Sequence, residues 1–263
     1  MRRRFVLLVL ALLCYPGLAA AVSGVNVRWG KCYSDAGAGN RTFSCGTNNG
    51  SETAVFAFKL DHAKTDVTGI EVYVAVATAA PTIPAWWQFS SGGCRRGALS
   101  ASPVLPSGSL NCVDWGQGTQ QGGLAAYFVG NVAPNQARAT IGYAVPSSAP
   151  VTLQPNQEYF ACNLVISHAN TRALADTAAC AGCTVPAAIF FEGLRIATGV
   201  TSEDFTGPSN ERESQWVTWQ NGQLTNLLFP ACPAGSLACQ FGRFTTFGVS
   251  AGPQMRYFKA GAR

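Results

Sequence analysis

Apolar and polar residues alternate with a period of two along much of the chain, in short segments separated by Gly, Pro, Ser and Asn. In the segment 53–60, Ala54, Phe56 and Phe58 share one face, while Lys59 lies on the other. This period is typical of β-strands with one buried face. The pattern predicts strands at 25–29, 53–60, 68–78, 124–129, 137–145, 158–168, 186–198, 215–219 and 243–249.

Helical periodicity does not extend beyond two turns, and 171–179 is the best candidate for one short helix. Short strands with turns at this spacing favour an all-β fold, an antiparallel β-sandwich of jelly-roll type. We expect this sandwich at 22–200. The composition turns polar and charged at 201–214, so 201–263 is predicted to be a C-terminal, disulfide-stapled extension that packs on the sandwich or completes it.

The first residues have the features of a secretory signal peptide. Three arginines follow Met1, an apolar run occupies 5–13, and small residues occupy 19–21. We therefore expect residues 1–21 to be removed and the protein to be secreted or held at the cell surface. The apolar run is too short to cross a bilayer, which takes about 20 residues, so no transmembrane segment is predicted.

The charge of the chain is low once the signal is set aside. Only 12% of the residues are charged, and three of the 18 basic residues lie in the signal, which leaves 15 against 13 acidic residues. The longest basic run after it is Arg95-Arg96. Because a phosphate backbone is bound by several clustered cations, a nucleic-acid partner is not expected.

Nine of the 10 cysteines lie after the signal, and in an exported chain they predict disulfides. Proximity along the sequence predicts three bonds, one between Cys32 and Cys45, one between Cys94 and Cys112, and one between Cys232 and Cys239. The remaining cysteines, Cys162, Cys180 and Cys183, then compete for one bond. One cysteine is left over, and it is either free and buried or paired between chains.

The motif formed by Cys180 and Cys183 could also be half of a zinc site or a redox pair. A second such motif or a nearby pair of histidines is missing, and no strand followed by a helix supports a thioredoxin-like role. We therefore predict a disulfide here, and no metal or cofactor.

Glu192 is the best candidate for a catalytic acid. Strict alternation places it on the same face as Phe190 and Leu194, and burying an unpaired carboxylate is costly. It must find a partner, lie at a sheet edge or have a shifted pKa. His168, in the apolar register of another strand, is a possible partner. A glycan hydrolase needs a pair of carboxylates but no sequence motif, so this activity stays open.

The stretch PAWWQFSSGGC at 84–94 is the best candidate for a ligand site. If it is extended, Trp86 and Trp87 point to opposite sides, so one ring can stack on a sugar while the other is buried. Arg95, Asp114 and Trp115 would lie nearby if Cys94 and Cys112 were bonded. The alternative is that both rings fill the core, as large aromatic side chains usually do.

Several short motifs are spread over most of the mature chain, namely VNVRW at 25–29, FSCGTN at 43–48, WW at 86–87 before GCR at 93–95, CAGC at 180–183 and VTWQ at 217–220. In these the chain resembles a family of uncharacterised secreted, cysteine-containing, β-rich bacterial proteins. The resemblance implies no activity, cofactor or catalytic residue.

We therefore expect a secreted, non-catalytic module with a structural, adhesive or ligand-binding role. Its partner would be an extracellular glycan or another cell-surface component. Two alternatives stay open: a secreted glycan hydrolase whose carboxylate pair includes Glu192, and self-association or filament formation through an unpaired sheet edge.

Overall fold

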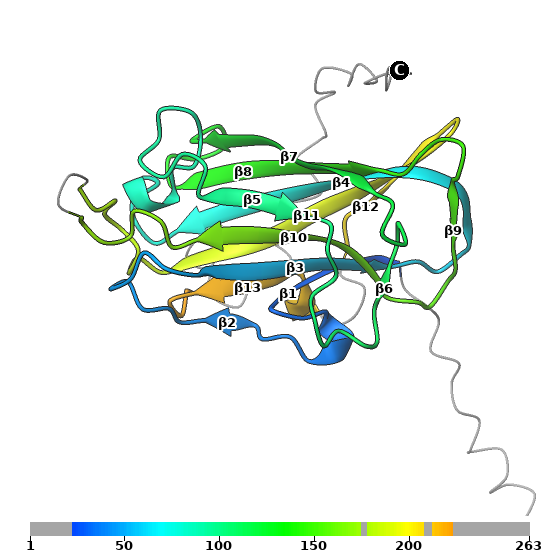
Figure 1. The fold of residues 1–263 in the computed structure, drawn as a ribbon, viewed down its shortest axis with the longest axis horizontal. Helices are drawn as coiled ribbons and strands as arrows, with labels where there is room; N and C mark the ends of the chain where they lie inside the picture. Colours follow the sequence, from blue (N-terminus) through cyan, green and yellow to red (C-terminus); the bar gives the residue numbers. More distant parts are fainter. Residues whose placement is uncertain (1–22, 175–177, 208–211, 223–263) are drawn as a thin grey trace, which may run out of the picture.

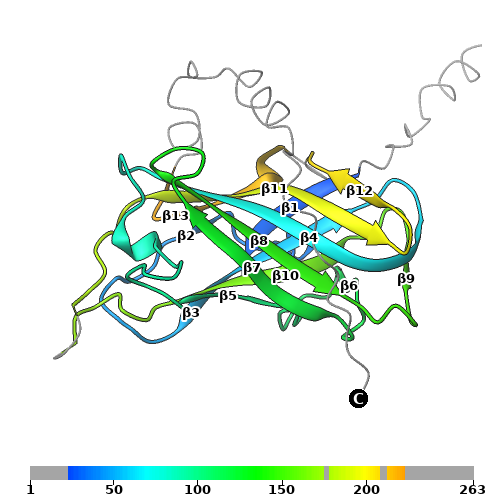
Figure 2. The same cartoon turned by 90° about the horizontal axis from the view of Figure 1, so that it is seen from above.

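The computed structural model describes residues 23–174, 178–207 and 212–222. These residues form an antiparallel β-sandwich of two sheets, with three short 3-10 turns and no α-helix among them, as Figures 1 and 2 show. This confirms the predicted fold class. The three turns are η2 (Tyr33–Asp35), η3 (Ala85–Trp87) and η4 (Arg212–Gln215).

The smaller sheet has five strands, and β3 lies between β1 and β10. Four strands follow one another across it, in the order β1 (Gly24–Trp29), β3 (Ser51–Lys59), β10 (Tyr159–Ser167) and β5 (Leu99–Ser102). The fifth, β6 (Val113–Asp114), pairs in parallel with the start of β10.

The larger sheet has eight strands, with the two longest at its centre. Across it run β2 (Asn40–Arg41), β13 (Trp216–Trp219), β11 (Ala187–Thr198), β4 (Lys64–Thr78), β8 (Gln136–Ala144) and β7 (Gln121–Val129). Two short strands, β12 (Ser202–Phe205) and β9 (Val151–Leu153), pair with β11 and β4 respectively. β2 and β7 are therefore the two ends of this sheet, and they lie at opposite margins of Figure 1.

The core lies between the two sheets and is made of the inward faces of their strands. Phe56 of β3 and Phe191 of β11 meet edge to face across it, with ring centroids 5.0 Å apart. Both side chains are fully buried. Each such ring stabilises the fold by about 1.5–3 kcal/mol relative to an exposed one, so the sandwich is held mainly by these apolar layers.

Eight of the nine predicted strands are present within a few residues of their predicted ends, and the ninth, 243–249, lies outside the described residues. The sequence analysis missed β2, β5, β6, β9 and β12. They have two to four residues each, which is too short for a period of two to stand out.

The helix predicted at 171–179 is wrong for the described residues of that segment, which have no helical structure. The side chain of Asn48 forms hydrogen bonds with both the backbone N–H and the backbone C=O of Arg172. Its Oδ1 accepts from Arg172 N at 2.7 Å and its Nδ2 donates to Arg172 O at 2.9 Å. These bonds tie the segment to the loop before β3 rather than to itself.

The disulfide pairs predicted from proximity along the chain are wrong. The bonds join Cys32 to Cys112, Cys45 to Cys183, and Cys94 to Cys180. Cys162 is free and fully buried, which is one of the two outcomes expected for the extra cysteine. The predicted bond between Cys232 and Cys239 lies outside the described residues.

The disulfides join segments 80 to 138 residues apart, because the sandwich brings distant loops together at its ends. The bond between Cys32 and Cys112 covers the outer side of the smaller sheet, where Val55, Ala57 and Phe160 form a second small apolar cluster with it. Three disulfides indicate folding in an oxidising, extracellular-type environment.

The region beyond residue 200 is part of the larger sheet as far as the structure describes it. Both β12 and β13 pair with β11. The division into a sandwich at 22–200 and an extension at 201–263 stays a prediction. Among the described residues no helix has the length and apolar character needed to span a membrane.

Candidate functional site

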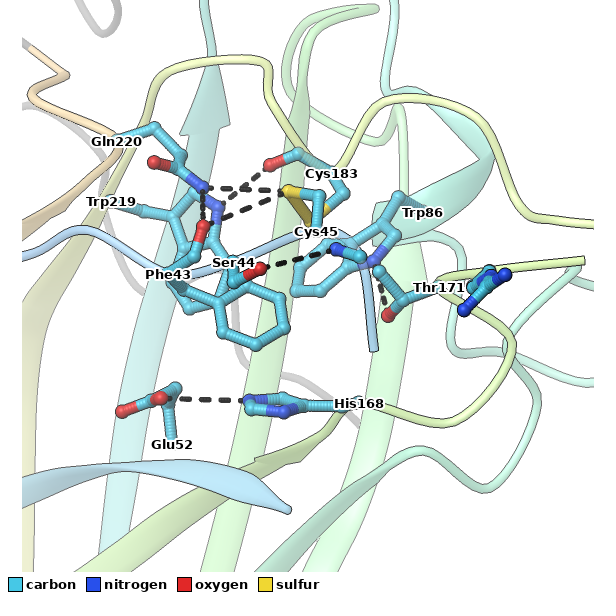
Figure 3. The surroundings of a disulfide bond; sticks show 12 residues. Phe43, Ser44, Cys45, Glu52, Trp86, His168, Thr171, Cys183, Trp219 and Gln220 are labelled. Atoms are coloured by element: carbon cyan, nitrogen blue, oxygen red, sulfur yellow. Dashed lines mark hydrogen bonds and ion pairs between the residues drawn. A yellow bond between two sulfur atoms is a disulfide. The ribbon is translucent and has the colours of Figure 1, made fainter. Parts of the chain in front are cut away.

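Trp86 and Trp87 are both fully buried, so the predicted sugar-stacking platform is wrong. The pair sits in the 3-10 turn η3 and not in an extended segment, so the two rings need not point to opposite sides. They pack edge to face at 5.0 Å, and Trp219 lies 4.9 and 5.6 Å from them. Trp86 Nε1 donates to Thr171 Oγ1 at 3.0 Å. The rings belong to the core cluster, and Figure 3 shows Trp86 and Trp219 beside the bond between Cys45 and Cys183.

Arg95 is also fully buried and cannot bind a ligand from solvent. Its guanidinium lies 3.7 Å from the ring centre of Trp86 and donates to three backbone carbonyls, those of Ala169 (2.9 Å), Trp86 (3.1 Å) and Ser167. Burial lowers the pKa of Arg95 to about 9, so it keeps its charge at neutral pH. Arg95 therefore links η3 to the end of β10.

Asp114, at the end of β6, and Trp115 after it hold the turn before β7. The carboxylate of Asp114 accepts from Gly116 N (3.1 Å), Gly118 N (2.7 Å) and the Gln120 side chain (2.7 Å), and the Trp115 ring is buried. The reason for expecting them beside Arg95 was a bond between Cys94 and Cys112, which does not form.

The side chain of Glu192 does not face the core, because the residue lies at a β-bulge. Phe191 pairs with Val74 and Gly193 pairs with Tyr73, so Glu192 is the extra residue of β11. The core face consists of odd-numbered residues before the bulge, such as Phe191, and of even-numbered ones after it, such as Leu194. The carboxylate thus leaves the apolar face on which strict alternation placed it.

The partner of Glu192 is Arg138 of β8 and not His168, which corrects the sequence prediction. Arg138 Nη2 donates to Glu192 Oε1 at 2.7 Å. Burial still raises the pKa of Glu192 above its ordinary value, and the charge and hydrogen bond of Arg138 lower it in part. An ion pair that reaches from β11 across β4 to β8 accounts for this acid without a catalytic role.

A cluster of polar and charged side chains from β4, β11 and β12 lies on the larger sheet. The Tyr73 hydroxyl donates to Glu71 at 2.5 Å. Arg195 binds Asp204 through two hydrogen bonds of 2.8 and 3.1 Å, and its guanidinium lies 5.9 Å from the Tyr73 ring centre. Sequence reasoning missed this cluster, because its members are spread over 133 positions and meet only through strand pairing.

His168 instead faces Glu52 at the end of the smaller sheet (Figure 3). Its Nδ1 lies 2.6 Å from the carbonyl of Asn49 and therefore carries the proton, while Nε2 lies 3.5 Å from Glu52 Oε1. Glu52 also binds Arg41, and the His168 ring packs on Phe43 at 3.7 Å. The contact with Glu52 joins the end of β10 to β3, and the contacts with Asn49 and Phe43 hold the loop that carries Cys45. This loop is also fixed by the bond between Cys45 and Cys183.

The structure adds one further feature, the free edge of β7. β7 pairs with β8 on one side, and within the described residues no backbone hydrogen bond reaches its other side. Its nine residues, QGGLAAYFV, contain no charge and no proline. Ala125 is exposed, and Phe128 is 51% exposed. The larger sheet thus ends in a long, uncharged, open edge.

Comparisons with known proteins add little to this geometry. No protein-family model matches the chain, and no curated protein sequence matches it. Among solved structures it is similar to the cohesin module from Clostridium perfringens ATCC13124 family 33 glycoside hydrolase, at 8% sequence identity and a TM-score of 0.30. The match covers 71% of this chain and 96% of that one. A likeness at this TM-score carries no information on function.

Proposed function

We propose that this protein is a secreted, non-catalytic extracellular module that acts by adhesion, through the open β7 edge of its larger sheet. The observation that carries the proposal is the length and neutrality of that edge. Backbone N–H and C=O groups on an open edge can bond to an extended segment of another chain, whatever its side chains are.

The environment of the chain supports this role. The signal-like N-terminus and the three disulfides both suit a protein that works outside the cell, where the environment is oxidising. The low charge after the signal suits contact with another protein surface rather than with a polyanion.

The hydrolase alternative has less support, because the groups proposed for chemistry have structural partners. Arg138 neutralises Glu192, and His168 is held by Asn49 and faces Glu52. A hydrolase would need Glu192 and a second carboxylate about 5 to 10 Å apart beside a bound sugar. Release of reducing sugar from a glycan panel, abolished in Glu192→Gln, would favour it.

The adhesive role can be tested with immobilised protein. Purified, oxidised protein is attached to a surface at matched density, and the cells that secrete it are passed over under flow. We expect Phe128→Lys, at the β7 edge, to lose most of the retained cells. Leu110→Lys is the matched control, since Leu110 is 87% exposed in the loop between β5 and β6, outside the β7 strand. Equal retention by the parent and Phe128→Lys would contradict the proposal.

Glycan binding is a second candidate, supported by one observation. Tyr73 offers a partly exposed ring beside Glu71 and Arg195, and sugars are commonly held by an aromatic ring with charged hydrogen-bonding groups nearby. A broad glycan array tests it with Tyr73→Ala and the control Tyr33→Ala. Loss of a signal in the first variant alone would favour this site, and an absence of signal in the parent would remove it for those glycans.

A further inference from the structure

We infer that the segment which occupies the β7 edge is the β7 strand of a second copy of this chain, so that two molecules share one continuous sheet. The inference rests on the proposed adhesive edge and names its partner. It draws on three properties of β7: its rigidity, its neutrality and its position as the one long open edge that the described residues contain.

β7 is already held as an extended strand, which is the conformation that strand pairing needs. Tyr127 points inward and donates to the Trp87 carbonyl at 2.7 Å, and Leu124 and Val129 pack against the core. Gly122 lies against β8 so closely that a Cβ there would be 1.9 Å from the Gly142 carbonyl oxygen. A strand held in this way loses little conformational freedom on binding, so more of the contact energy appears as affinity.

A copy of β7 is a chemically suitable partner for β7. In a fully overlapped antiparallel pair, the middle residue of the strand, Ala125, meets its own copy about a two-fold axis. Because the strand has no charge, no like charges meet across the pair. The six residues 124–129 are apolar and aromatic without proline or glycine, the composition of segments that pair with their own copies.

One structural feature of β7 limits pairing but does not abolish it. The register with β8 shifts between Leu124 and Ala126, so Ala125 is a bulged residue. A bulge at an edge increases twist, which is one way in which proteins discourage edge pairing. The other common protections, charge and proline, are missing from the strand.

The arrangement of the sheets predicts a closed dimer and not a filament. At the opposite end of the larger sheet β2 has two residues, and at the edge of the smaller sheet β5 has four. β1 is longer, but Val25 N at its outer side already donates to the Gly207 carbonyl. Since the described residues contain one long open edge, a two-fold pair of them uses both edges and leaves none for a third copy.

The pair should be weak, because one strand against another buries less than the roughly 1,600 Å² of a standard interface. We therefore expect a dissociation constant between about 1 µM and about 1 mM, with rapid exchange. Such an affinity suits a protein that becomes concentrated at a surface.

Sedimentation velocity of the purified, oxidised protein tests the inference, over a series from about 1 µM to about 1 mM. The parent should shift from monomer to dimer. Ala125→Lys and Ala125→Glu should each weaken the dimer about tenfold or more, because each places like charges opposite one another. Val200→Lys, at a position 94% exposed in the turn after β11, is the matched control and should behave as the parent.

The decisive arm is an equimolar mixture of Ala125→Lys and Ala125→Glu. Opposite charges then face one another, so the mixture should regain the dimer that each variant loses alone. Regained association also shows that both variants are folded. A monomeric parent at the highest concentration, an unaffected Ala125→Lys, or a mixture that stays monomeric would each overturn the inference, as would growth beyond a dimer.

The result can be separated from the adhesive role proposed above. Cell retention that depends on Phe128 in a protein that stays monomeric would overturn the β7 pair while leaving adhesion to a different chain standing. A β7 dimer without any cell retention would support the pair and overturn adhesion to cells.

Discussion

Replacing Arg95 by Met should destabilise the fold strongly, because the guanidinium is a buried link and not a ligand-binding group. The change removes three hydrogen bonds from a charged donor and the contact with the Trp86 ring. A carbonyl left without its donor costs about 1–3 kcal/mol, and a buried cation–ring contact contributes about 2 kcal/mol. Methionine carries no charge, so the variant avoids the desolvation cost of burying the guanidinium, and this offsets part of the loss.

The net cost should be about 3–5 kcal/mol, a large share of the 5–15 kcal/mol that holds a typical protein folded. For a chain of this size it corresponds to a fall in Tm of about 10 °C. Arg95→Lys should cost about 2–3 kcal/mol, since one ammonium cannot reach three carbonyls in the same way. Arg96→Met is the matched control: Arg96 is exposed, so its cost should be below about 0.5 kcal/mol.

The assay is urea unfolding followed by tryptophan fluorescence, with the disulfides intact in all four proteins. Trp86 reports directly on the Arg95 environment, because its ring lies under the guanidinium. If Arg95→Met unfolds within about 1 kcal/mol of Arg96→Met, the structural role assigned to Arg95 is refuted. A folded, stable Arg95→Met would reopen the ligand-binding interpretation of this residue.

Three further changes test other parts of the structure. Burial raises the pKa of Glu192 above 4.5, so the folded state holds the proton of this carboxyl more tightly than the unfolded state does. As pH rises from about 4.5 through the raised pKa, the free energy of unfolding of the parent should therefore fall relative to that of Glu192→Gln. Urea unfolding measures both, and an equal pH dependence in the two proteins would contradict this prediction. Burial also raises the pKa of the Cys162 thiol, so peptide mapping after iodoacetamide treatment at pH 8 should find Cys162 unmodified in the native protein and modified in denaturant; equal modification would show that it is accessible. Removing the bond between residues 138 positions apart with Cys45→Ala and Cys183→Ala together should cost about 3–5 kcal/mol in urea unfolding, and a cost below 1 kcal/mol would show that packing alone holds that end of the sandwich.

The strands were predictable from the sequence because their alternation is local and strong. Phe56, Phe58 and the neighbouring Ala54 do face the core as the period of two predicts. The disulfide pairing was not predictable in this way. It depends on which loops the sandwich brings to the same end, and that is decided by strand order rather than by distance along the chain.

Bulges explain where alternation fails. One extra residue in β11 moves Glu192 off the core face, and a register shift in β10 places Phe160 on the opposite side from Cys162. A bulge leaves no reliable trace in a single sequence, because it is set by pairing with the neighbouring strand. The sequence nonetheless indicated that strict alternation fails at Glu192, because burying an unpaired carboxylate on the core face costs free energy.

The candidate aromatic site failed for a related reason. Trp86 and Trp87 are both buried because they lie in one 3-10 turn. Two adjacent tryptophans in a sequence do not predict such a turn. The β7 edge was invisible for the opposite reason. Its sequence resembles any half-buried strand, and only the strand order shows that it has a neighbour on one side.

Amide hydrogen exchange along β7 is the most direct test of the open edge. About half of the β7 amides point away from β8, as in any antiparallel edge strand. At low protein concentration these amides should exchange as fast as exposed loops, while their β8-bonded neighbours are protected, and at high concentration the outward amides should become protected as copies pair. Protection of both sets at the lowest concentration would mean that the edge is covered within one chain, and would contradict the account.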